Sequence, residues 1–148
     1  LRPGILSREY LSDVLGKEVV YDSSLMTAPD ELADPEAGAA DTSFKPRSPG
    51  MKYKHYSPKA DVILIEGSAE RFEKRSRELG LDAMKQGKRT AIIDYGDDPK
   101  KAAHKFFSDL RELDRVGYDL ILVRALDRRG RGFGVMNRML KSAGYEVV

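Results

Sequence analysis

A parallel α/β sheet with helices on both faces is the fold predicted for residues 59–148. Three short apolar runs recur in this part of the chain, at 62–65, 90–93 and 120–123. Continuous apolar runs of this length are typical of strands buried on both faces. Each run is followed by a stretch with helical spacing of apolar residues, and such alternation joins parallel strands by right-handed crossovers. We expect three to five strands.

The first strand–helix unit turns at Gly67-Ser68. Ser68 is a good N-cap because its oxygen can accept from free backbone amides, and Glu70 suits the positive end of the helix. The helix is expected to end near Gly87. The residues expected to face the sheet are Ala69, Phe72, Ser76, Leu79 and Ala83.

The second helix is predicted from Pro99 to Val116, since proline fits the first helical position. On its outer face Lys105 and Asp109 have the i,i+4 spacing of an ion pair. The acidic segment before it can bind Mg²⁺ through oxygen ligands or cap the helix, and we favour capping. That segment contributes Asp94, Asp97 and Asp98. The residues expected to face the sheet are Ala103, Phe106, Phe107, Leu110 and Leu113.

An arginine- and glycine-rich loop, residues 124–134, leads into a last helix that is expected to end at Gly144. Residues 146–148 are expected to add a short final strand. A helix N-terminus attracts anions, and arginines supply forked donors, but the spacing is not that of the dinucleotide fingerprint. A structural turn is favoured over contact with an anion or RNA. The residues of that second interpretation are Arg128, Arg129, Arg131, Asn137 and Arg138.

Composition restricts the chemistry that this chain can perform. The 148 residues contain no cysteine and two histidines, which excludes zinc–thiolate sites and cysteine nucleophiles and disfavours a histidine-rich metal site. A net charge of +2 gives no general grip on nucleic acid, and no apolar run approaches membrane-spanning length. We therefore expect no metal site and no catalytic residue in residues 59–148, and a binding or regulatory role for them.

The front of the chain is irregular. A short helix is predicted from Ser7 to Leu15, with Gly16 as its stop, and a brief strand is predicted at 18–21. Residues 22–46 have no periodicity and predict loop or disorder.

Residues 47–58 separate this front from the α/β part. Pro49 and Pro58 bracket an extended segment that carries two lysines, two tyrosines and a histidine. Ammonium and imidazolium groups can meet several oxygens of a nucleotide triphosphate. From composition by itself, a solvated linker is favoured over a binding segment.

The segment 48–58 resembles the interdomain linker of the long, two-domain threonylcarbamoyl-AMP synthases. Residues 1–4 look like the exit from the last strand of that family's YrdC-like catalytic domain, and residues 106–114 and 130–143 look like its C-terminal domain. The resemblance implies three parts. They are a tail end of the catalytic domain at 1–21, an interdomain linker or lid at 22–58, and a Rossmann-like C-terminal domain at 59–148.

The resemblance also implies a reaction, in which ATP, L-threonine and bicarbonate give threonylcarbamoyl-AMP and pyrophosphate. This nucleotidyl transfer prepares the t6A modification of tRNA in the cytoplasm, with Mg²⁺ in the catalytic domain and the tRNA-modifying machinery downstream. By itself the chain is expected to be inactive and to hold no cofactor. A homodimer, and a nucleotide- or RNA-binding regulatory module without catalysis, stay open as alternatives. The residues expected to contact ATP or its phosphates are Arg2, Ser48, Lys52, Tyr53 and His55.

Overall fold

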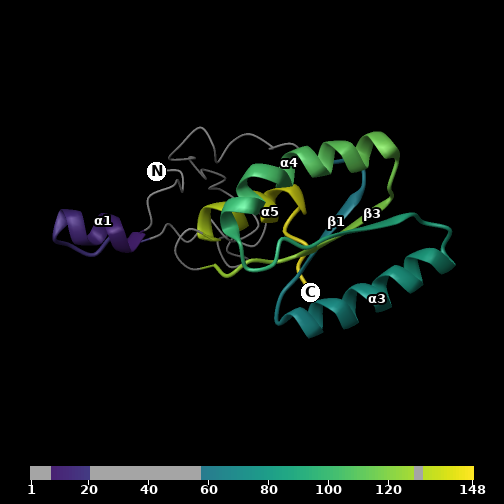
Figure 1. The fold of residues 1–148 in the computed structure, drawn as a ribbon, viewed down its shortest axis with the longest axis horizontal. Helices are drawn as coiled ribbons and strands as arrows, with labels where there is room; N and C mark the ends of the chain where they lie inside the picture. The colour runs from purple at the N-terminus through teal and green to yellow at the C-terminus, as the bar shows by residue number, and fades with distance from the viewer. Residues whose placement is uncertain (1–7, 21–57, 129–131) are drawn as a thin grey trace, which may run out of the picture.

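The computed structural model describes residues 8–20, 58–128 and 132–148. The elements in chain order are α1 (Arg8–Leu15), β1 (Asp61–Ile65), α3 (Ala69–Lys85), β2 (Thr90–Ile93), α4 (Pro99–Val116), β3 (Leu120–Arg124) and α5 (Gly132–Ser142) (Figure 1). Several predictions lie outside the described residues. They concern the linker and the individual residues Arg2, Ser48, Lys52, Tyr53, His55, Arg129 and Arg131.

The sheet has three parallel strands, as the alternation of apolar runs predicts, and the structure arranges them in the order β1-β3-β2. β3 is central, because Asp61–Ile65 and Thr90–Ile93 both pair with it. The predicted final strand is reduced to one parallel bridge between Leu64 and Val147. There the backbone amide of Leu64 donates to the carbonyl of Glu146 at 3.0 Å.

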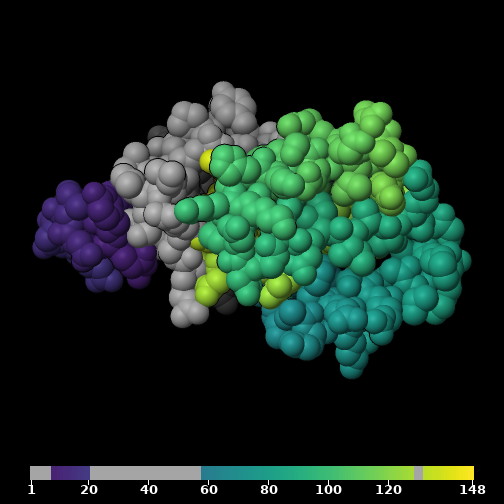
Figure 2. Space-filling view, viewed as in Figure 1, coloured from purple at the N-terminus to yellow at the C-terminus, as the bar shows by residue number. Residues whose placement is uncertain are grey.

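Helices cover both faces of the sheet, which confirms the predicted three-layer arrangement. α3 lies on one face, and α4 and α5 lie on the other (Figure 1). In the space-filling view, side chains of α4 and α3 enclose the sheet from two sides (Figure 2). The larger core lies on the α4/α5 face around Leu64, Phe106 and Met139, and a smaller one on the α3 face contains Phe72 and Leu122.

The predicted inner face of α3 is largely confirmed. Phe72, Ser76 and Ala83 are buried and Leu79 is partly buried. Ala69 is exposed, so its assignment to this face is wrong. As the first residue of α3 it lies where the helix has only begun to cross the sheet.

The bounds of α4 are those predicted, but its predicted face is one residue off. Ala102 is fully buried and Ala103 is exposed, because the inward stripe follows the i,i+4 spacing of Ala102, Phe106 and Leu110. The helix begins after Asp98, whose carboxylate accepts from the amides of Lys100 at 2.9 Å and Lys101 at 3.1 Å. Capping, the favoured interpretation of this aspartate, is confirmed.

The front helix α1 agrees with its prediction and ends before Gly16, which has a φ of 62°. The strand predicted at 18–21 is wrong for residues 18–20, which have no regular structure. The amide of Val19 donates instead to the hydroxyl of Ser12 at 2.9 Å, so this part of the chain folds back on α1. Among the described residues, no helix is long and apolar enough to cross a membrane.

Candidate functional site: the carboxyl edge of the sheet

Parallel strands deliver their following loops to one edge of a sheet, where ligands of α/β proteins usually bind. Here that edge receives Glu66–Ser68 after β1, residues 94–98 after β2 and residues 125–128 after β3. Because β3 lies between the other two strands, its last residue, Arg124, is at the centre of the edge.

The guanidinium of Arg124 joins the β2 loop to the central strand. Its side chain is 11% exposed, and its two terminal nitrogens lie 3.5 Å from Asp94 Oδ1 and 3.0 Å from Asp97 Oδ1. These two aspartates, considered for Mg²⁺ binding, therefore face an arginine. Within residues 8–20, 58–128 and 132–148, no three acidic or histidine side chains are placed to hold a metal ion.

The Nε atom of Arg124 is buried and has no hydrogen-bond partner within the described part of the chain. Leaving such a donor unsatisfied costs about 1–3 kcal/mol. A charge-assisted hydrogen bond to Asp97 and the ion pair with Asp94 offset this cost. Arg124 therefore clamps the loop after β2 to the central strand, with its terminal nitrogens already occupied.

Arg128, one of the residues predicted to contact an anion or RNA, pairs with a carboxylate across the edge. Its Nε donates to Glu66 Oε1 at 2.9 Å, and its terminal nitrogen contacts the same oxygen. Both side chains are partly exposed, so the pair contributes little stability. An incoming anion would nevertheless have to displace Glu66 to use this arginine.

The other described residues of that predicted set lie on α5. Asn137 is 5% exposed and belongs to the interior, whereas Arg138 is partly buried. The described members thus do not share one open face. Asn137 is placed to position α5 rather than to meet a macromolecule at the surface.

Gly132, in the arginine–glycine loop as predicted, is in fact the first residue of α5. A Cβ atom here would lie 2.1 Å from the backbone carbonyl oxygen of Asp127. No side chain fits against a backbone atom at that distance. The requirement for glycine comes from close packing of the chain on itself, which supports the structural interpretation of the loop.

The N-termini of α3 and α4 are occupied by their own caps. Ser68 Oγ accepts from the amide of Arg71 at 3.3 Å, and its hydrogen bond to Glu70 lowers the pKa of that carboxyl. The pKa of Asp98 is likewise lowered, chiefly by its hydrogen bond from the Lys101 amide. Both caps already use amides that an anion would otherwise bind.

Tyr95 is a buried residue of this edge that the sequence analysis did not single out. Its hydroxyl donates to Asp109 Oδ2 at 2.7 Å, and the residue is 6% exposed. Burial and this carboxylate raise the pKa of the phenol. The predicted pair of Lys105 with Asp109 is wrong, since Asp109 turns towards Tyr95. A tyrosine two residues after a strand was the available signal.

At the opposite end of the domain, a carboxylate of α4 binds the backbone just after the linker. Asp114 Oδ1 accepts from the amide of Lys59 at 2.9 Å and from that of Ala60 at 3.5 Å. A carboxylate in the last turn of a helix opposes the helix dipole, so this placement is explained by the two amides that it binds. Beside it lies a depression of about 370 Å³ lined by Lys59, Lys88 and Asp119, among others.

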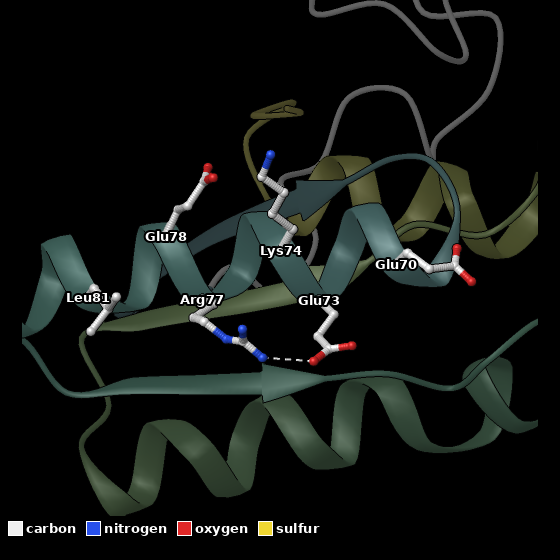
Figure 3. Close-up of a pocket in the computed structure, with 6 residues that line it drawn as sticks. All are labelled: Glu70, Glu73, Lys74, Arg77, Glu78 and Leu81. Carbon is white, nitrogen blue, oxygen red and sulfur yellow. Dashed lines mark hydrogen bonds and ion pairs between the residues drawn. The ribbon is translucent and has the colours of Figure 1, made fainter.

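A second depression, of about 380 Å³, lies on α3 (Figure 3). All of its lining residues come from that one helix. Lys74 and Glu78 point away from the sheet, while Glu73 and Arg77 reach towards β2 (Figure 3). One helix face cannot enclose a small ligand, so this depression is an open surface.

The fold and the ion-paired edge define a class of protein. This is a Rossmann-like α/β domain whose described residues hold loops together and contain no metal cluster. Residues 6–144 match the family described as "Threonylcarbamoyl-AMP synthase, C-terminal domain", and the chain belongs to that family.

Similar proteins agree with this assignment. The whole chain is 32% identical to a threonylcarbamoyl-AMP synthase of Pyrococcus abyssi and 29% identical to one of Bacillus subtilis. The chain spans 43% and 42% of the lengths of these relatives. With a Schizosaccharomyces pombe relative it shares 34% identity, over 70% of this chain and 31% of the relative.

Solved structures extend the comparison. P. abyssi Sua5 complexed with L-threonine superposes with a TM-score of 0.79 and 30% identity, over all of this chain and 43% of that one. A C-terminal Sua5 domain from Pyrococcus horikoshii gives a TM-score of 0.52 and 28% identity, over 62% of this chain and 98% of that one. These matches confirm the Rossmann-like fold.

Proposed function

We propose that this chain is the C-terminal part of an enzyme that forms threonylcarbamoyl-AMP from ATP, L-threonine and bicarbonate for t6A modification of tRNA. The observation that carries the proposal is similarity along the entire chain to relatives named threonylcarbamoyl-AMP synthase, of which it spans less than half. One of those relatives was solved with L-threonine. On this basis most of the substrate pocket, and any Mg²⁺, belong to the part of the enzyme that this chain does not span.

The linker is the part of this chain proposed to reach the reaction. Lys52 and His55 supply positive charge to the triphosphate and to departing pyrophosphate, which stabilises charge that develops in the transition state. Ser48 and Arg2 contribute hydrogen bonds to the nucleotide. Tyr53 helps to exclude water when the linker closes over the site.

A solved relative gives independent support for one linker position. In a P. abyssi Sua5 structure, a histidine and the tyrosine directly after it are both replaced by alanine. This chain has two histidines, and only His55 is followed by a tyrosine, Tyr56. His55-Tyr56 is therefore the one place in this sequence where a histidine is followed by a tyrosine, as in the pair altered in the relative.

The front of the chain fits the proposal that residues 1–21 complete the catalytic domain. α1 buries none of its residues, and its Tyr10, Val14 and Leu15 side chains are at least half exposed. An exposed apolar face on a short helix is stable only when it packs on another surface. The catalytic domain of the longer protein is the surface that we propose.

The test uses the full-length enzyme that contains this chain. We expect His55→Ala to slow pyrophosphate release with ATP, L-threonine and bicarbonate at least tenfold, about 1.4 kcal/mol of barrier. The control is His104→Ala, which removes the other histidine from the exposed face of α4. Equal turnover of His55→Ala and the parent would remove His55 from the site. If the unaltered full-length enzyme forms no threonylcarbamoyl-AMP from these substrates, the proposed reaction itself is refuted.

The alternative of a nucleotide- or RNA-binding regulatory module has less support from the described residues. Arg128 is engaged by Glu66, and the caps of α3 and α4 occupy their first-turn amides. Titrating the 148-residue chain with tRNA at two salt concentrations decides the matter, because phosphate contacts give a steep salt dependence. Binding that weakens in Arg128→Ala would favour the alternative.

A further inference from the structure

β2 presents an open edge of the sheet. In the described part of the chain it pairs with β3 and with no other strand. The carbonyl of Arg89 accepts from the amide of Leu120 at 3.1 Å, so the backbone of residue 89 faces β3. Since successive residues of a strand alternate in direction, Ala91 and Ile93 also face β3. Thr90 and Ile92 therefore turn their backbone amides and carbonyls outward.

The side chain of Ile92 adds an apolar surface to this edge. It is 58% exposed, whereas Leu122, its register partner on β3, is fully buried. Both lie on the face that α3 covers, so α3 shields the central strand and leaves the edge strand open. β2 contains no charge and no proline, the usual means by which an edge strand avoids pairing with another chain.

Two charged side chains of α3 lie beside the same edge. Glu73 and Arg77 form an ion pair of 2.8 Å, with 72% and 70% of their side chains exposed. Figure 3 shows both reaching from α3 towards β2, which runs between α3 and α4. When the helix is rotated by 180° about an axis perpendicular to its own, an acidic and a basic residue one helical turn apart exchange their order along it. Such a pair is complementary to a second copy of itself.

We propose that two copies of this chain associate through the outer edges of their β2 strands, antiparallel around a twofold axis near Ala91. Outward amides and carbonyls of Thr90 and Ile92 then pair across the axis, and the two three-stranded sheets become one. The α3 helices lie side by side, with Glu73 of each copy facing Arg77 of the other. An interface in which the same patch serves both copies is the usual form of a homodimer.

Reciprocal charge favours a second copy over a strand from another protein. Any exposed strand can add to the edge through backbone hydrogen bonds, and an inverted copy supplies in addition both the arginine for Glu73 and the carboxylate for Arg77. The inference concerns an assembly surface and does not depend on the proposed reaction.

The first experiment measures the dimer directly. Sedimentation equilibrium of the 148-residue chain, from about 1 μM to about 1 mM because small interfaces bind weakly, is expected to show a monomer–dimer equilibrium. Ile92→Lys places a charge on the edge and is expected to raise the dimer dissociation constant at least about tenfold. Val116→Lys is the matched control, since it adds the same charge to another exposed valine, 40% exposed, at the end of α4 and on no surface proposed to bind a partner.

The second experiment tests the twofold geometry. Arg77→Glu places like charges across the axis and is expected to weaken the dimer, whereas the double variant Glu73→Arg/Arg77→Glu restores both pairs and the parent dissociation constant. Circular dichroism at low concentration confirms that each variant is folded. A chain that stays monomeric throughout the range overturns the proposal. A dimer indifferent to Ile92→Lys, or one that the double charge exchange does not restore, overturns it equally.

Discussion

Gly132 and Gly80 make a matched pair for testing the packing at the start of α5. Both are glycines within helices, and alanine is ordinarily favoured over glycine there by about 0.5–1 kcal/mol. At Gly80, in α3, an added Cβ meets nothing within 4 Å. At Gly132 it would lie 2.1 Å from the carbonyl oxygen of Asp127. The same substitution should therefore have opposite signs at the two positions.

The magnitude at Gly132 follows from this contact. Ordinary carbon–oxygen contacts are about 3.3 Å or longer, so Gly132→Ala requires the backbone to shift by about 1 Å. Overpacking of this kind costs about 1–3 kcal/mol, and the gain in helix propensity offsets at most about 1 kcal/mol of it. The expected result is a net loss of about 1–2 kcal/mol in the free energy of unfolding.

Urea unfolding followed by far-ultraviolet circular dichroism measures both variants. With a slope of about 2 kcal/mol per molar urea, Gly132→Ala is expected to lower the midpoint by roughly 0.5–1 M. Gly80→Ala is expected to raise the midpoint, because it reduces the freedom of the unfolded chain without a clash. A Gly132→Ala chain as stable as its parent would refute the packing argument and reopen ligand contact as the reason for this glycine.

Two further predictions concern titrating groups. Tyr95→Phe should lower the free energy of unfolding by about 1–2 kcal/mol at neutral pH, since Asp109 loses a donor. Because the folded-state pKa of Tyr95 is raised, the parent should also lose stability as the pH rises above about 10, where the unfolded phenol ionises. Unfolding curves at increasing alkaline pH should lack this loss in the variant, and an identical alkaline slope would contradict the assignment. The lowered pKa of Asp98 acts in the opposite direction, because its contribution is present above the unfolded carboxyl pKa and is lost as the pH falls below about 4. Asp98→Asn retains a capping oxygen and should therefore reduce the loss in the free energy of unfolding at acid pH. The same loss in the variant and the parent would disprove this assignment.

The helix bounds were the most predictable part of the fold, because their signals are local. Pro99 at the first helical position and an aspartate before it gave the start of α4 correctly. The start of α5 was missed, since it depends on contact between Gly132 and the carbonyl of Asp127, which no residue-type preference records. The face of α4 was displaced by one residue because neighbouring alanines, Ala102 and Ala103, fit a helical stripe equally well.

The carboxyl edge was predictable in outline and not in its contacts. The sequence placed polar loops after each strand, and parallel pairing gathers them. It did not show that Arg124 would reach Asp97, 27 residues away, or that Arg128 would reach Glu66, 62 residues away. The i,i+4 rule failed for Asp109 because a buried tyrosine hydroxyl is a stronger partner than a solvated lysine.

Local apolar periodicity was sufficient by itself to determine that this chain forms parallel strands separated by helices, and the 48–58 segment was sufficient to point to its family. Tertiary structure alone decided the order β1-β3-β2. That order puts Arg124 beside the acidic loop that follows β2 and leaves Ile92 on an open edge. The physical reason is that periodicity records which side of an element is buried, whereas the neighbour of each strand depends on packing among segments far apart in the chain.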